Sequence, residues 1–360
     1  EMWRRVRSLC RTIQISRYAM NIDNIKKIEL EITSNCNAAC PGCARTQNID
    51  LFDVESFYLE DIKRLFPTER YIANKQFKFC GVLGDPALNK DAVLMTEYLT
   101  NSRGYCQWST NGAYQTADWW SKLGQISKDT NLVDVSFCVD GHKETNHIYR
   151  VGTKWNVLER NMQAYSDAGG KATWIFIVFD HNEYELEAAR EHAKRLGFAF
   201  ATRTGMRNSY HDWVSLIGKK NQQEKKVITT TGKKEHSKKA QVEQLDKIIL
   251  ENKVDEKIIN TIKCKLIHEG EIFISAKQEL WPCCFLWDSA FKNKENILDK
   301  LSEYQTGWNS LKTNSIEDVL VHPWFDKVLS DSWDPTHSKH ITRCIRTCAY
   351  NKAYQNEIKV

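Results

Sequence analysis

The sequence of 360 residues contains no long apolar run. No stretch approaches the roughly 18 consecutive apolar residues of a membrane-spanning helix, and the first residues, EMWRRVRSLCRTIQIS, lack the uninterrupted apolar core of a secretion signal. Both absences argue against a membrane protein or a secreted one, so we expect a cytoplasmic location. With 41% hydrophobic residues the chain can still bury a large core, in one large domain or two smaller ones.

Known RNA-binding patterns are also missing. The sequence has no aromatic RNP pattern, no GXXG loop of the KH kind and no separate basic domain. Residues 219–239 do carry eight Lys against two Glu, a charge of +6, whereas the whole chain carries only +5. We interpret this segment as a solvated linker, and attraction of an acidic peptide or nucleic acid is the alternative. Binding of nucleic acid therefore stays an open alternative that no recognisable module supports.

Cysteine, in contrast, is abundant, with twelve residues. In a reducing compartment, clustered thiols are more often metal ligands or redox centres than disulfides. Seven of the twelve fall into two groups: Cys36, Cys40 and Cys43 near the start, and Cys264, Cys283, Cys344 and Cys348 near the end. The other five are expected to be small buried hydrophobic residues: Cys10, Cys80, Cys106, Cys138 and Cys284.

Between the two cysteine groups, strand-like and helix-like segments alternate. Six β-rich segments mostly end in Gly, Asn or Asp and are the expected strands: 26–34, 77–84, 105–112, 132–141, 171–179 and 198–205. Apolar residues at helical spacing predict helices within 54–66, 154–169 and 184–197. Repeated strand–helix units with right-handed crossovers imply a curved parallel sheet in an α/β fold. Chemistry in such folds lies at the carboxyl ends of strands, and the first three cysteines follow the first strand.

The first cysteine group has the donor set of an iron-sulfur site. Three thiolates can hold three irons of a 4Fe-4S cube while the fourth iron stays open to bind another molecule. A zinc knuckle would need a fourth Cys or His at short spacing, and none follows before Cys80. A thioredoxin-like Cys-x-x-Cys motif would not need Cys36. We therefore favour the cluster over these two alternatives.

The Cys36-x3-Cys40-x2-Cys43 loop resembles the cluster loop of the radical S-adenosylmethionine (radical SAM) enzymes, whose core is a partial (β/α)6 barrel. GVLGDPALN (81–89) resembles the Gly-Gly-Glu-type segment of that family, and STNG (109–112) and VSFCVDG (135–141) resemble its later strand ends. The likeness covers roughly residues 26 to 205. By this resemblance, the residues expected to contact S-adenosylmethionine (SAM) are Gly84, Asp85, Ser109, Asn111, Ser136, Asp140 and Arg150.

The resemblance implies a reaction. In these enzymes SAM chelates the open iron, and electron transfer from the reduced cluster cleaves the sulfonium to a 5′-deoxyadenosyl radical, which abstracts a hydrogen atom from the substrate. One position departs from the family pattern. The residue before the third cysteine is usually bulky and packs near the adenine, but here it is Gly42. We expect a side chain from elsewhere in the chain to fill that place.

The second cysteine group predicts another metal site. Residues 272–284 are typical of a β-hairpin, which brings Cys283 toward Cys264, and Cys344 and Cys348 are four residues apart, on one face of a helical turn. Four thiolates suit either structural zinc or a second Fe-S cluster. The Pro-Cys pair at 282–283, the HPWF stretch and the closing cysteine pair resemble a twitch domain, the shorter relative of the SPASM domain, which implies an auxiliary 4Fe-4S cluster. Cys284 could exchange roles with Cys283 or remain a free thiol near the substrate.

These features together predict four segments. They are a basic N-terminal extension (1–25), a radical SAM partial barrel (26–215), a Lys-rich linker (216–258) and a twitch/SPASM-like domain (259–360). We expect a radical SAM enzyme with two 4Fe-4S clusters that modifies a peptide or protein and takes electrons from a flavodoxin or ferredoxin. The alternatives are a twitch-type dehydrogenase or rearrangement enzyme acting on a small sugar or nucleotide, an RNA-modifying enzyme, and a non-catalytic iron-sulfur or zinc scaffold.

Overall fold

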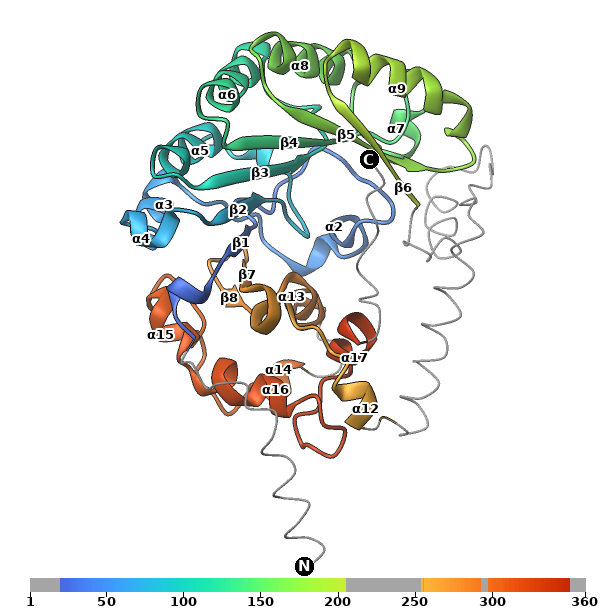
Figure 1. The fold of residues 1–360 in the computed structure, drawn as a ribbon. Helices are drawn as coiled ribbons and strands as arrows, with labels where there is room; N and C mark the ends of the chain where they lie inside the picture. The colour runs from blue at the N-terminus through green and yellow to red at the C-terminus, as the bar shows by residue number, and fades with distance from the viewer. Residues whose placement is uncertain (1–19, 205–253, 255, 293–296, 350–360) are drawn as a thin grey trace, which may run out of the picture.

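A curved sheet of eight strands organises the chain (Figure 1). The structure is a computed structural model that describes residues 20–204, 254, 256–292 and 297–349. The strand order is β6-β5-β4-β3-β2-β1-β7-β8, and neighbours from β6 to β7 are parallel. Strand bounds are β1 Lys27–Leu30, β2 Gln76–Phe79, β3 Tyr105–Thr110, β4 Val133–Cys138, β5 Ala172–Val178, β6 Ala199–Thr204, β7 Glu271–Ile274 and β8 Leu280–Trp281. All six predicted strands are confirmed, and so is the predicted parallel sheet.

Helices follow each of the first five strands (Figure 1). In that view α3, α5, α6, α8 and α9 lie along the outer side of the curved sheet, whereas α2 lies on its inner side. Their bounds are α2 Ala44–Gln47, α3 Leu59–Leu65, α4 Glu69–Ile72, α5 Ala92–Asn101, α6 Ala117–Thr130, α7 Asn146–Tyr149, α8 Trp155–Asp167 and α9 Leu186–Arg195. The three helices predicted from sequence correspond to α3, α8 and α9. Among the described residues, no helix combines the length and hydrophobicity that crossing a membrane requires.

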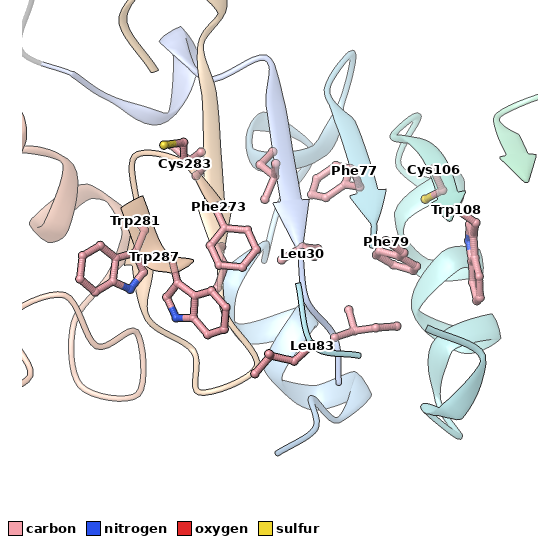
Figure 2. Packing of buried hydrophobic residues seen from close by; sticks show 14 of the residues in the cluster. Leu30, Phe77, Phe79, Leu83, Cys106, Trp108, Phe273, Trp281, Cys283 and Trp287 are labelled. Atoms are coloured by element: carbon pink, nitrogen blue, oxygen red, sulfur yellow. The ribbon is translucent and has the colours of Figure 1, made fainter. Parts of the chain in front are cut away.

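The two faces of the strands differ in chemistry because side chains alternate along a strand. The face beneath the helices is apolar. On it Phe79 of β2 is in register with Trp108 of β3, and their ring centroids are 5.4 Å apart (Figure 2). Cys106 lies on this apolar face with no exposed surface, as expected for a small buried hydrophobic residue. The opposite, inner face is polar and partly exposed: Gln76, Lys78, Gln107, Ser109, Asp134 and Ser136.

A polar inner face distinguishes this sheet from a filled barrel, in which branched aliphatic side chains pack the centre. The inner side of β2 to β4 is therefore a polar, partly exposed surface and not an aliphatic core. Cys80 and Cys138 also occupy inner-face positions and are partly exposed. For these two residues the expectation of a buried hydrophobic role is wrong, because the strand register turns them toward the polar side.

The predicted hairpin is confirmed and has a further pairing partner. β7 and β8 are antiparallel, and β7 also runs parallel to β1, with Glu29 opposite Phe273. The sheet of the barrel thus continues into residues assigned to the C-terminal segment. The remaining helices gather beyond this edge of the sheet: α12 Glu256–Ile259, α13 Cys284–Phe291, α14 Ile297–Lys300, α15 Ile316–Leu320, α16 Leu329–Asp331 and α17 Thr342–Cys348. Residues 1–19 of the predicted N-terminal extension and residues 216–253 of the Lys-rich linker lie outside the described residues.

A buried carboxylate joins the loops that follow β1, β2 and β7. Glu31 is 1% exposed, and its Oε1 accepts the backbone N–H groups of Leu83 (2.6 Å) and Gly84 (3.4 Å), while its Oε2 accepts that of Ala276 (3.5 Å). Burial raises the pKa of Glu31 from 4.5 to about 7, although these hydrogen bonds oppose the rise. Folding therefore favours the protonated carboxyl group in this pH range.

This burial predicts a pH-dependent effect of Glu31→Gln. A raised pKa in the folded state means that the wild type loses stability relative to the Gln variant as pH rises from 4.5 to about 7. We expect the variant to gain about 2 to 3 kcal/mol on the wild type between pH 5 and pH 8. Thermal unfolding at both pH values measures this gain. Glu60→Gln, at an exposed position on α3, should show no such trend; an equal trend in both variants would contradict the assignment.

Candidate functional site

The first three cysteines lie on one loop after β1, at the carboxyl edge of the parallel strands. Cys40 is buried and Cys36 and Cys43 are partly exposed. Backbone hydrogen bonds fix the loop: the Cys43 N–H donates to Cys40 O (3.0 Å), and the Ala39 N–H donates to Val151 O (2.8 Å), in the segment that follows β4. The loop is thus held against the end of another strand.

Groups from three other strand ends reach these sulfurs. Asn111 Nδ2 lies 3.8 Å from Cys36 Sγ, Arg150 Nη1 lies 3.8 Å from Cys40 Sγ, and Cys43 Sγ lies 3.9 Å from the Val82 carbonyl oxygen. Burial, the Asp85 carboxylate and the two other thiols raise the pKa of Cys36 to about 12. The three thiols are therefore close enough to influence one another electrostatically.

The residues after β2 pack directly on the start of the cysteine loop. A Cβ atom added to Gly84 would lie 1.7 Å from Thr33 O, so only glycine permits this approach. The next residue, Asp85, donates its N–H to Asn35 O (2.8 Å). Its carboxylate is 5% exposed and accepts from Thr110 Oγ1 (2.7 Å) and from the backbone N–H of Asn111 (2.7 Å). Asp85 thereby links the ends of β2 and β3 beneath Cys36.

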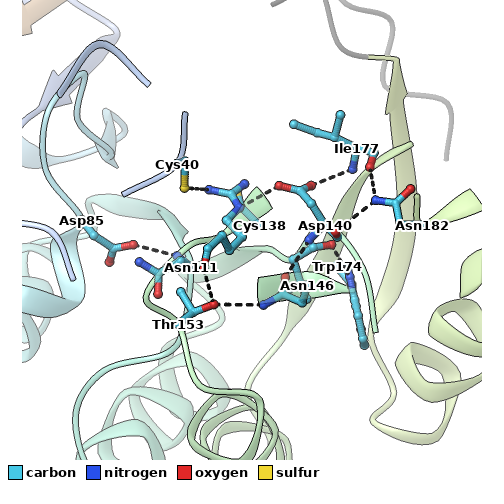
Figure 3. A network of polar contacts seen from close by, with 12 residues as sticks. Cys40, Asp85, Asn111, Cys138, Asp140, Asn146, Thr153, Trp174, Ile177 and Asn182 are labelled. Atoms are coloured by element: carbon cyan, nitrogen blue, oxygen red, sulfur yellow. Dashed lines mark hydrogen bonds and ion pairs between the residues drawn. The ribbon is translucent and has the colours of Figure 1, made fainter. Parts of the chain in front are cut away.

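An ion pair connects the end of β4 to the cysteine loop (Figure 3). Arg150 Nε donates to Asp140 Oδ2 at 2.7 Å, and Asp140, with no exposed surface, also accepts the Ile177 N–H at 2.7 Å. Burial disfavours the charge on Arg150, but Asp140 and Cys40 outweigh it and hold the pKa of Arg150 well above its ordinary value. Arg150 is therefore a fixed cation beside the thiols, and Asp140 holds it in place.

The two predicted serines take a different position. Ser109 of β3 and Ser136 of β4 are in register with each other on the inner face, and both are partly exposed. Their hydroxyls therefore lie on the polar inner wall, whereas Asp85, Asn111, Asp140 and Arg150 surround the cysteine loop.

Two aromatic residues missed by the sequence analysis pack beside this loop. Tyr149 is 5% exposed, and it and Phe179 share a small apolar cluster with Ala38 and the three cysteines. The ring centroids of Tyr149 and Phe179 are 4.7 Å apart. Phe179 directly follows β5, and its position at a strand end was the signal that could have identified it. A bulky residue at the position of Gly42 usually packs near the adenine in the radical SAM enzymes. Tyr149 and Phe179 are the candidates to take its place here.

The second group of four thiols also comes together. Cys264, Cys283, Cys344 and Cys348 are each at most 9% exposed. Burial raises the pKa of Cys344, and the other three thiols raise it further. Cys344 and Cys348 lie on α17, as the spacing predicted, and the Lys263 N–H donates to Cys348 O (2.9 Å). The structure thus brings residues about 80 positions apart into one buried site.

The donor chemistry of this second site fits a bound metal centre. Backbone N–H groups of Leu266 and Ile267 point at Cys264 and lower its pKa, and those of Phe285 and Leu286 do the same for Cys283, although burial dominates at both thiols. Such N–H groups stabilise thiolate sulfur when it ligates a metal. Within the described ranges, no three Cys, His, Asp or Glu side chains are grouped to hold a single ion.

Cys283 and Cys284 face different surroundings. Cys283 interacts with Cys264, Cys344 and Cys348. Cys284 lies beside Glu29, Lys265 and Lys78, and burial followed by the Glu29 carboxylate raises its pKa well above the ordinary value. Cys283 is therefore the residue positioned with the other three thiols, and Cys284 belongs to a separate set of side chains.

Comparison with known proteins gives matches to structures only. No sequence profile of a protein family matches the chain, and no curated protein matches it. Streptococcus suis SuiB superposes with a TM-score of 0.52 and 11% identity, over 95% of this chain and 82% of SuiB. SuiB bound to precursor peptide SuiA gives the same score and identity, over 84% of this chain and 66% of SuiB. A histidine-tagged form of anSMEcpe with bound AdoMet gives 0.50 and 15%, over 90% and 88%.

The proteins compared are radical SAM enzymes, and their partial barrel corresponds to strands β1 to β6. The chain has the radical SAM fold. It spans about two thirds of the SuiB chains with bound SAM (65%) or bound peptide (66%). The predicted fold class is confirmed, and the roles of individual residues remain predictions.

A charged cluster inside the radical SAM barrel was also missed by the sequence analysis. Glu29 of β1 is 4% exposed, and its Oε1 lies 3.2 Å from Lys78 Nζ and 3.3 Å from Cys80 Sγ. Lys265 lies 3.9 Å from Glu29 Oε2 and forms an ion pair with Glu271. The signal available in the sequence was the alternation of charged and apolar residues in β1 and β2, which places Glu29 and Lys78 on one face.

The two neighbouring cysteines provide a matched test of the second thiol site. After anaerobic iron-sulfur reconstitution we expect about eight irons per chain, in accord with three plus four thiolate ligands. Cys283→Ser should lower the iron content by about four, whereas Cys284→Ser should leave it unchanged. Iron and acid-labile sulfide assays measure both.

Replacement of Cys36, Cys40 and Cys43 by Ala should also remove about four irons. The four-thiol assignment is wrong if the chain retains one tightly held zinc and only one cluster, or if Cys284→Ser causes the larger loss.

Proposed function

We propose that this protein is a radical SAM enzyme that reductively cleaves SAM and abstracts a hydrogen atom from a peptide or protein substrate. The observation that supports it best is the loop with Cys36, Cys40 and Cys43 at the carboxyl edge of a radical SAM barrel, with Arg150 and Asn111 reaching two of its sulfurs. A 4Fe-4S cluster bound by these thiolates would supply the electron and the open iron for SAM.

The chain's own residues provide the setting for that chemistry. Arg150, fixed by Asp140, places a permanent positive charge beside Cys40, where it can bind the carboxylate of SAM. The close approach of Gly84 to Thr33 keeps the backbone after β2 against the cysteine loop, where it can meet the amino group of SAM. Tyr149 and Phe179 cover the loop with apolar surface and limit the access of water.

A peptide or protein is the proposed substrate. SuiB, which has a similar fold, has been solved with its precursor peptide SuiA, and this chain shares the partial barrel. The polar inner wall, with Ser109 and Ser136, offers hydrogen-bonding groups to a bound chain. We also propose an auxiliary 4Fe-4S cluster at the four-thiol site within a twitch/SPASM-like domain, and a flavodoxin or ferredoxin as reductant.

A cytoplasmic location agrees with the state of the thiols. None of the eleven cysteines of the described residues is in a disulfide, and clustered thiols are typical of a reducing compartment.

A second candidate function is a dehydrogenase of the twitch type. Such an enzyme needs a proton acceptor near the oxidised group. Among the described residues, none donates a hydrogen bond to the buried Glu29 Oε2, and Lys265 Nζ lies 3.9 Å from it. A small alcohol bound there could donate to Glu29. Detection of an oxidised small-molecule product, with no change in any peptide, would favour this candidate.

The proposed reaction predicts a specific product. Reconstituted, reduced protein given SAM should form 5′-deoxyadenosine, measured by liquid chromatography with mass detection. Replacing Cys36, Cys40 and Cys43 by Ala should abolish the product, because the open iron is lost. Cys344→Ala should retain SAM cleavage in the absence of substrate. Protein that contains both clusters and never forms 5′-deoxyadenosine would show that it is a scaffold.

The contribution of Arg150 to SAM binding can be separated from its contribution to folding. Arg150→Ala would leave Asp140 buried and unpaired, which costs about 3 to 5 kcal/mol. The double variant Arg150→Met with Asp140→Asn removes both charges, so it should keep the fold and the iron of both clusters. We expect SAM affinity to fall at least about tenfold.

Equilibrium binding of SAM to the reconstituted variants measures that loss, and Arg190→Met, on the exposed side of α9, is the control. Unchanged SAM affinity in the double variant would exclude Arg150 from the SAM site.

A further inference from the structure

A cavity of about 230 Å³ lies between the segment after the cysteine loop and the C-terminal hairpin. Its volume is about that of eight water molecules in the liquid, which is enough for one long side chain. Four aromatic residues line it: Phe52, Trp281, Trp287 and Phe291. The rings of Trp287 and Phe291 are stacked at 5.2 Å, and Phe52 meets Phe291 edge-on at 5.8 Å. The cavity thus has rigid aromatic walls.

The polar lining is predominantly acidic. Glu31, Asp53, Glu55 and Glu279 border the cavity, against the single cation Lys277. Within the described part of the chain, Asp53, Glu55 and Glu279 form no ion pair, and the closest polar contact of the Glu279 side chain is a 3.5 Å hydrogen bond from Trp281 Nε1. Aromatic faces together with uncompensated carboxylates attract cations.

One cation already lies against the outer wall. Arg45, on α2, donates from Nη1 to Ser34 O (2.7 Å), and its guanidinium lies 5.3 Å from the centre of the Phe52 ring. Even with Arg45 counted beside Lys277 and with Glu31 protonated, Asp53, Glu55 and Glu279 leave an excess of one negative charge. The Phe52 ring therefore already contacts one guanidinium, and the negative charge of the cavity lining can attract a second cation.

The cavity also shares chain segments with the proposed active site. Ser34 and Leu83 form part of its lining, and Ser34 lies two residues before Cys36. Leu51, which lines the cavity, is 58% exposed although it is apolar, and Val54, the neighbour of Asp53 in the chain, is 59% exposed. An exposed apolar edge beside an acidic pocket fits a chain that carries both apolar and basic side chains.

We propose that this cavity binds the cationic side chain of a lysine or arginine in the peptide substrate. The proposal rests on the proposed peptide-modifying function and deepens it. The aromatic walls contact the cation by cation–π interaction, Asp53 and Glu55 neutralise its charge, and the apolar edge packs against a neighbouring residue of the peptide. The pocket would thereby set which segment of the peptide enters the barrel.

The test uses two probes that differ in charge alone. Acetyl-Gly-Arg-Gly-amide and its citrulline counterpart are titrated by calorimetry into the reconstituted full-length protein. We expect the arginine peptide to bind at least about tenfold more tightly. Asp53→Asn with Glu55→Gln should abolish this preference. The matched control, Asp50→Asn with Glu60→Gln, removes two charges from the same region outside the cavity and should retain it.

Equal affinity for the two peptides, or a preference that persists in the Asp53 and Glu55 variant, would overturn the proposal. So would a preference that emerges only after the N-terminal arginines are replaced by Gln, because the chain's own basic segment would then be the occupant: Arg4, Arg5, Arg7, Arg11 and Arg17. Formation of 5′-deoxyadenosine is measured on the same samples without peptide. If the wild-type protein cleaves SAM but binds both peptides equally, only the proposed cation pocket is refuted. If it prefers the arginine peptide but does not cleave SAM, only the proposed function is refuted.

Discussion

The Glu31 carboxylate is the interaction on which the rest of the structure depends. It accepts backbone N–H groups from the loops after β2 and β7 while its own strand, β1, leads into the cysteine loop. A buried carboxylate without these donors would be costly, so the three loops are required to meet. The contacts of these loops with Glu31 fix the cysteine loop, the segment around Asp85 and the C-terminal hairpin relative to one another.

The parallel pairing of β1 with β7 adds a second constraint. It makes the C-terminal residues part of the barrel sheet, and it carries Phe273 and α13 onto the inner side of β1. The charged cluster around Glu29 thus combines residues from the start and the end of the chain. The C-terminal part therefore contributes side chains to the inner face of the sheet as well as the four-thiol group.

Much of this arrangement could be predicted from the sequence, since the signals are local. Alternation of apolar residues and strand ends at Gly, Asn or Asp identified all six barrel strands, and cysteine spacing identified both thiol groups. The pairing of β1 with β7 could not be predicted, because it joins segments more than 240 residues apart. The surroundings of Cys284 and Glu29 could not be predicted either, because they depend on that pairing. Nor could the hydrogen bonds by which the Asp85 carboxylate links the ends of β2 and β3.

Two pairs of adjacent residues divide between the two sites. Cys264 and Cys283 face the four-thiol group, while their neighbours Lys265 and Cys284 face the charged cluster inside the barrel. At both points, neighbouring residues of the backbone therefore belong to two different clusters of side chains, and Lys265 is close enough to act on the Cys283 and Cys348 thiols as well. A shift of either backbone by one residue would therefore remove a thiol from the four-thiol group and put a member of the charged cluster in its place.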